Sequence, residues 1–134
     1  MVEDQITDGR RIAELLASEI DGRSDDELAS LAVTNVDRDV EPAVGGAPAF
    51  DISVVDDDGD PLERLARVFV HPDRAHLEFG RGREAAVDAA GETGLRTRPK
   101  ATTPAKTLVF LERAAAVKRG VAVVQAAARD GGVR

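Results

Sequence analysis

Lysine and arginine are concentrated in one segment of the second half of the chain, residues 95–119. The only acid in this segment is Glu112, and its cations are Arg96, Arg98, Lys100, Lys106, Arg113, Lys118 and Arg119. Alternate residues of an extended chain point to the same side, so Arg96, Arg98 and Lys100 are expected to form a row. Guanidinium groups donate paired hydrogen bonds to phosphate oxygens. The segment therefore predicts binding of phosphate groups, those of RNA or a nucleotide among them.

Two other interpretations of the basic segment stay open. Residues 1–60 contain 17 acids and 4 bases, whereas residues 61–134 contain 8 acids and 14 bases. The positive charge can therefore neutralise the acidic half of the chain, either within one molecule or across a contact between two. It can also belong to a loop that is simply solvated.

A second group of polar residues lies around the sequence His71-Pro72-Asp73-Arg74, which is typical of a tight turn between two strands. With Pro72 in the second position of the turn, Phe69 pairs with His76 and Arg67 pairs with Glu78 as a cross-strand ion pair. The outer face of this hairpin is expected to be exposed and to meet a protein partner or a second copy of the chain. Its candidate interface residues are Arg67, Phe69, His71, Arg74 and His76.

The residue types needed for catalysis or metal binding are scarce. The chain has no cysteine or tyrosine and 2 histidines, so thiolate nucleophiles, disulfides and cysteine zinc sites are excluded. His71 and His76 share a face, but two histidines on one hairpin seldom complete a metal site, and they are expected at the surface. No catalytic residue, metal ligand or cofactor is assigned, and a binding domain is favoured over an enzyme.

Aromatic residues are equally scarce, which bears on RNA binding. Proteins that read single-stranded RNA stack its bases on exposed rings, and this chain has 4 phenylalanines and no tryptophan or tyrosine. Phe50, Phe79 and Phe110 are expected in the core, which leaves Phe69 beside His76. Contacts to the phosphate backbone are therefore expected rather than recognition of bases.

The glycines Gly80 and Gly82 flank Arg81 where a strand is expected to lead into a helix. Backbone amides at such a point can hold an anion. The segment lacks the further residues of a nucleotide-binding motif, so a tight connection is the favoured interpretation.

The periodicity of apolar residues predicts the elements that position these groups. Helices are expected over residues 8–21, 83–90 and 113–129, with a capping box at residues 24–27, and strands over residues 31–36, 49–54, 65–70, 75–79 and 107–111. Gly120, inside the last helix, marks a place where another element approaches closely. The fold class is α+β, with a mainly antiparallel sheet of four to five strands and two to three helices packed on one face. Residues 1–134 are expected to form a single domain.

The composition points to a salt-rich habitat. The chain has 134 residues, a net charge of −7 and 43% hydrophobic residues, and aspartate exceeds glutamate while lysine is rare. This pattern is typical of halophilic proteins, and because no signal peptide or membrane span is evident, we expect a cytoplasmic location. At molar salt the Debye length is about 3 Å, so a partner must be recognised through direct contacts.

Several stretches resemble a haloarchaeal family of small acidic proteins of unknown function. They are DQITDGRRIA (residues 4–13), VFVHPDRA (68–75), RTRPKA (96–101) and KTLVF (106–110). The resemblance covers most of the chain and implies no activity.

The sequence therefore predicts a non-enzymatic binding domain, with a protein partner or a homodimer as the first hypothesis. Binding of a phosphate backbone through residues 95–119 is the alternative, and a small enzyme of unknown reaction is a weaker one. No membrane contact is expected.

Overall fold

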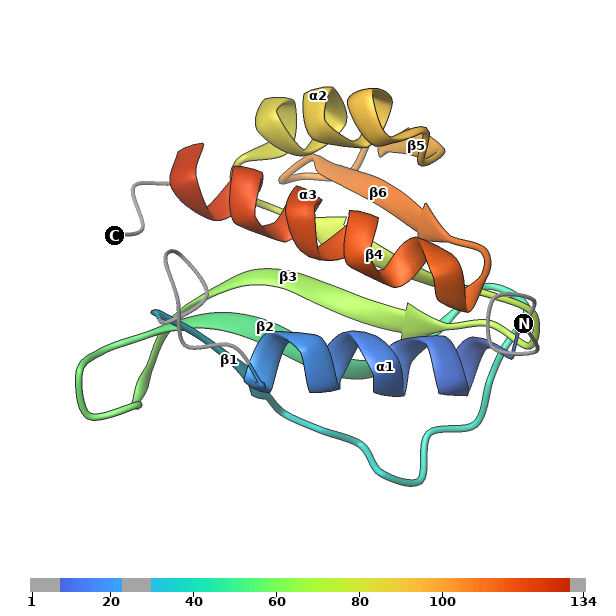
Figure 1. The fold of residues 1–134 in the computed structure, drawn as a ribbon, viewed down its shortest axis with the longest axis horizontal. Coiled ribbons are helices and arrows are strands. Elements are labelled where there is room, and N and C mark those ends of the chain that lie inside the picture. Colours follow the sequence, from blue (N-terminus) through green and yellow to red (C-terminus); the bar gives the residue numbers. More distant parts are fainter. Residues whose placement is uncertain (1–7, 23–29, 131–134) are drawn as a thin grey trace.

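The computed structural model describes residues 8–22 and 30–130, in which six strands form one antiparallel sheet. The strand order is β1-β2-β3-β4-β6-β5, and three helices lie against one face (Figure 1). The elements are α1 (Gly9–Asp21), β1 (Leu31–Thr34), β2 (Ala47–Val55), β3 (Pro61–Val70), β4 (Ala75–Phe79), α2 (Arg83–Thr93), β5 (Thr97–Lys100), β6 (Lys106–Leu111), the short 3-10 helix η3 (Ala114–Ala116) and α3 (Val117–Asp130). The predicted α+β class is confirmed.

Helix α1 forms where the periodicity predicts it. Asp8 is the N-cap and its side chain accepts from the amide of Arg11, which satisfies one of the free amides of the first turn. Ile12, Leu16 and Ile20 follow at intervals of four residues and are fully buried against the sheet. The predicted capping box at residues 24–27 lies outside the described residues.

The β3–β4 hairpin has the predicted register. Phe69 lies opposite His76 and Val70 lies opposite Ala75, and the turn is closed by the amide of His71, which donates to the carbonyl of Arg74 at 2.8 Å. Alternate residues therefore face the helices, as the turn chemistry indicates.

The sheet has six strands, whereas four to five were expected. Residues 97–100 form the edge strand β5, where we expected only an extended part of a basic loop, because Pro99 and its neighbours Arg98 and Lys100 have little strand preference. Pairing with β6 supplies the missing stability, with Arg98 opposite Leu108 and Lys100 opposite Lys106. Proline is tolerated there because one side of an edge strand needs no hydrogen-bond partner.

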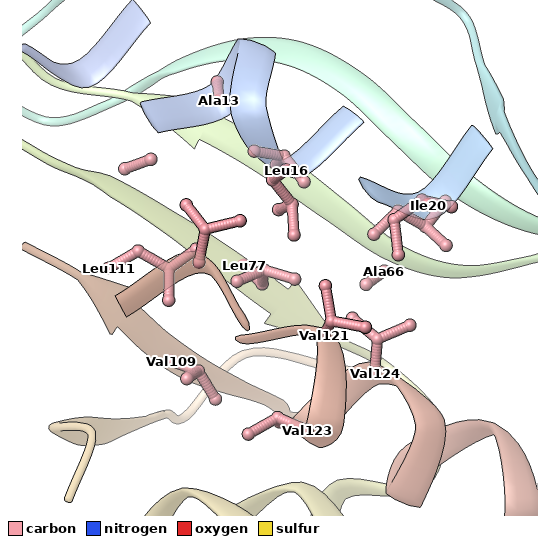
Figure 2. Close-up of a cluster of buried hydrophobic side chains, with 14 of the residues drawn as sticks. Ala13, Leu16, Ile20, Ala66, Leu77, Val109, Leu111, Val121, Val123 and Val124 are labelled. Atoms are coloured by element: carbon pink, nitrogen blue, oxygen red, sulfur yellow. The ribbon is translucent and has the colours of Figure 1, made fainter. Parts of the chain in front are cut away.

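The core lies between the sheet and the helices (Figure 2). Leu16 and Ile20 of α1, Leu77 of β4 and Val121 and Val124 of α3 meet in it, and each is at most 3% exposed. None of the helices in the described part of the chain is long and apolar enough to cross a membrane.

Two glycines allow α3 to pack closely on the sheet and on α2. A Cβ atom at Gly120 would lie 3.0 Å from a methyl group of Leu111, which confirms the expected close approach. Gly82 has φ 62° and a Cβ there would lie 2.3 Å from the carbonyl oxygen of Ala127. The Gly80–Gly82 connection is therefore required by backbone conformation and packing.

The packing at Gly82 is testable by substitution. Gly82→Ala should lower the free energy of unfolding by about 1–3 kcal/mol, because it adds left-handed strain and a backbone clash. Gly91→Ala is the matched control, since Gly91 lies inside α2 with no atom within 4 Å of the added Cβ. It should raise the free energy of unfolding by about 0.5–1 kcal/mol. Urea unfolding followed by circular dichroism measures both, and a Gly82→Ala protein as stable as the parent would contradict the packing described.

Candidate functional site

The sheet face opposite the helices, here called the open face, carries polar and aromatic side chains in place of a second apolar layer. No helix of the described residues covers it (Figure 1). Strand register assigns these residues to it: Asp51, Arg64, Arg67, Phe69, His76, Glu78, Arg98, Lys100, Lys106, Leu108 and Phe110, and Arg96 joins them by lying over Phe110.

A chain of hydrogen bonds runs across the open face from a loop to its edge. His71 Nδ1 lies 2.8 Å from the carbonyl oxygen of Val44, and His71 Nε2 lies 2.7 Å from His76 Nδ1. His76 Nε2 lies 3.2 Å from Glu78 Oε2, which in turn lies 3.3 Å from Lys100 Nζ. The two histidines therefore connect the Val44 loop to the edge strand.

Both histidines are buried, so the expectation that they lie at the surface is wrong. His71 is 4% exposed and His76 is 3% exposed. The loop before β2 folds back over them, and a Cβ at Gly46 would lie 3.0 Å from His76 Cε1 and 3.1 Å from His71 Nε2. Gly46 has φ 94°, so both its conformation and this close approach favour glycine.

The number of protons on the two histidine rings limits how many of these hydrogen bonds can form at once. The carbonyl of Val44 and the carboxylate of Glu78 only accept, so the three links between them need three ring protons, and two neutral imidazoles carry two. With both rings neutral, the three links cannot all hold a proton at once, and the tautomers of the two rings decide which of them is a hydrogen bond. The link between His76 Nε2 and Glu78 is the longest of the three, at 3.2 Å.

The environment of His76 favours the neutral ring. Burial lowers the pKa of His76, and the hydrogen bond with Glu78 opposes this without reversing it. Nearby His71 and Lys100 lower it further. Because His76 is neutral, the cation that pairs with Glu78 is Lys100.

Asp51 organises the other end of the open face. Its carboxylate accepts from Arg67 Nε at 2.8 Å and from Asn35 Nδ2 at 2.8 Å. Burial alone would raise the pKa of Asp51, but these hydrogen bonds outweigh it and hold the pKa below its ordinary value. The expected Arg67–Glu78 ion pair is therefore wrong, because Asp51 on the neighbouring strand binds Arg67.

The two aromatic rings of the open face differ in exposure. Phe69 stacks on His76 with ring centroids 4.8 Å apart, and the guanidinium of Arg96 lies 4.3 Å above the ring centre of Phe110. Phe110 is buried as expected, although beneath Arg96 on the open face and not in the core between sheet and helices. Arg74 approaches the same ring at 5.8 Å and pairs with Asp73. Phe69 is half-buried, so part of its side chain stays accessible on the open face.

Five cations surround a depression of about 430 Å³ on the open face, here called the basic hollow. Its charged residues are Arg64, Arg67, Arg81, Lys100 and Lys106, with the single carboxylate of Glu78. Arg64 and Arg81 were not among the predicted phosphate-binding residues. An extra residue in β3 at Leu65 puts Arg64 on the same face as Arg67, three positions away, which strict alternation forbids.

The remaining predicted phosphate-binding residues divide between two places. Arg96, Arg113 and Arg119 line a second depression of about 340 Å³ at the end of β6, here called the arginine hollow. Lys118 instead lies in the helix layer, beside Leu15 and Glu19. The structure thus divides the seven predicted cations into three groups. Arg98, Lys100 and Lys106 lie on the open face of β5 and β6, Arg96, Arg113 and Arg119 line the arginine hollow, and Lys118 lies apart from both.

A metal site does not form in the described residues: none of their histidine and acid clusters has three members placed to hold an ion. The facing nitrogens of His71 and His76 are hydrogen-bonded to each other.

Comparison with protein families gives one match, which covers residues 1–133. The chain belongs to a family of unknown function (DUF7993). Membership agrees with the resemblance to a family without known activity. Comparisons with curated proteins and with solved structures give no match.

The buried His76 predicts a pH dependence of stability. Its pKa is lowered in the folded protein, so between that value and about 6.5 the unfolded chain binds more protons. The free energy of unfolding should therefore rise with pH across this window and fall on acidification. Urea unfolding at several pH values should show a shallower slope for His76→Gln than for the parent, and equal slopes would contradict this account.

Proposed function

We propose that this protein binds phosphate groups on its open face through the basic hollow and the cations of β5. The observation that carries the proposal is the gathering of five lysines and arginines around one depression in a chain of net charge −7. Cations gathered in one depression raise the local concentration of anions. The planar fork of arginine matches the geometry of a phosphate group and donates two hydrogen bonds to it.

The cations of this face are only partly neutralised by the protein itself. Arg64 and Arg67 pair with Asp51, Arg81 pairs with Glu63 and Lys100 pairs with Glu78. Among the described residues, Arg98 and Lys106 form no ion pair. Lys106 is half-buried, with Nζ over Gly80, where a Cβ would lie 3.1 Å away. The first pairs orient the hollow, and the free cations remain available to a ligand.

The structure gives less support to a protein partner than the sequence did. That hypothesis placed the partner on the outer face around Arg67, Phe69 and His76, where His76 is buried and the other two are half-buried. The large apolar side chains that are exposed in the described residues are Val36 and Val44 in the connection between β1 and β2, Leu62 in β3 and Val87 in α2. None of these four belongs to the predicted interface.

We also propose that this binding takes place in a salt-rich cytoplasm. The surplus of aspartate, the rarity of lysine and the resemblance to haloarchaeal proteins support this setting. At molar salt only groups within about a Debye length, roughly 3 Å, attract each other. Oriented guanidinium groups at hydrogen-bond range retain their attraction under these conditions better than a diffuse positive field.

Charge reversal tests the proposed function. Arg98→Glu combined with Lys106→Glu should weaken binding of fluorescein-labelled oligouridine, measured by anisotropy, by about tenfold or more, because each lost contact is charge-assisted. Lys118→Glu combined with Arg83→Glu makes the same change of charge away from the open face, at two exposed residues that form no ion pair with any described residue. It should change the affinity by less than about threefold. Equal losses in both double variants, or no binding by the parent, would contradict the proposal.

A further inference from the structure

We infer that the ligand is an extended single strand of nucleic acid, whose backbone runs along β5 from the basic hollow to the arginine hollow. This inference rests on the proposed function and adds the class and the path of the ligand. Its basis is that two separate cationic depressions lie at opposite ends of the same pair of strands.

The arginine hollow is built to hold an anion in a defined place. Arg96 is fixed from below by the ring of Phe110, 4.3 Å from its guanidinium carbon, and from the side by Glu112 at 3.1 Å. Arg119 is fixed by a hydrogen bond to the carbonyl of Thr93 at 3.2 Å. Arg113 is exposed and forms no ion pair within the described residues. Three arginines and one carboxylate, that of Glu112, thus line this hollow.

The cations between the two hollows continue the path. Lys100 belongs to the basic hollow and Arg96 to the arginine hollow, and Arg98 lies midway between them on the open face. Four residues of extended chain span about 13 Å, and each step of two residues spans about 6.6 Å. A single phosphate or a mononucleotide cannot bridge that distance. A phosphodiester backbone repeats its charge on this scale, so successive phosphates can meet successive cations.

The aromatic rings near this path are few. Phe110 lies beneath Arg96, whereas Phe69 stacks on His76, is half-buried and lines the basic hollow. Phe69 is therefore the one phenylalanine of the described residues that lines either hollow and is not buried, so most contacts of the strand are expected to involve its backbone, and stacking on a single ring does not distinguish the bases. Binding should therefore be insensitive to base sequence, and oligouridine and oligoadenine of equal length should bind with equal affinity within about threefold.

A length series tests the path. Oligouridines of two, four and eight nucleotides are titrated into the parent protein and into Lys106→Gln, Arg113→Gln and the control Lys118→Gln. The octanucleotide should bind at least tenfold more tightly than the dinucleotide. Lys106→Gln and Arg113→Gln should each weaken the octanucleotide and reduce the slope of log K against log salt by about 0.7, the value for one lost contact to a single strand. Lys118→Gln should leave that slope unchanged.

The outcomes separate this inference from the proposed function. If the dinucleotide binds as tightly as the octanucleotide, the extended path is wrong while phosphate binding on the open face stands. If Arg113→Gln behaves as Lys118→Gln does, the arginine hollow is not on the path and the inference is overturned. Inorganic polyphosphate of equal charge is the other source of this chemistry, and tighter binding of polyphosphate than of the octanucleotide would overturn the assignment to nucleic acid. Failure of every phosphate ligand to bind would overturn the proposed function as well.

Discussion

The hydrogen bond from the amide of His71 to the carbonyl of Arg74 closes the turn on which the rest of the sheet depends. It sets the register of β3 against β4, so Val68 and Leu77 face the helices while Phe69 and His76 face away. A slip of one residue would move every apolar side chain of this hairpin to the opposite face. β2 and β6 pair with the two outer edges of the hairpin, so the register of the hairpin also decides which of their side chains face the helices.

Because the helices cover only one face, the other face must satisfy its own polar groups. Two networks do so: the carboxylate of Asp51 with Arg67 and Asn35, and the histidine chain that ends at Glu78 and Lys100. Leaving such buried groups without partners would cost about 1–3 kcal/mol each. The carboxylates of Asp51 and Glu78 are already bound within these two networks. The cations around the basic hollow therefore outnumber the carboxylates. The stability of the sheet and the proposed anion site thus have the same origin.

Local features of the sequence predicted those parts of the fold that local chemistry determines. The periodicity of apolar residues predicted α1, the proline turn predicted the β3–β4 register, and alternation placed Arg96, Arg98 and Lys100 on one side. The features that were missed depend on contacts between distant segments. Strand β5 exists because β6 pairs with it, and the histidines are buried because the Gly46 loop folds over them. Arg64 joins the basic hollow through a β-bulge that no periodicity reveals.

The central claim, that the open face binds phosphate groups, is tested most directly by mapping where a ligand touches the protein. Amide chemical shifts of the nitrogen-15-labelled chain would be followed during titration with octauridylate at fixed salt. The account predicts that the largest shifts fall on β5, on the start of β6 and on the Gly80 turn, while the amides of α1 stay unchanged. Shifts concentrated on α1 and the helix layer, or no shifts at saturating ligand, would contradict it.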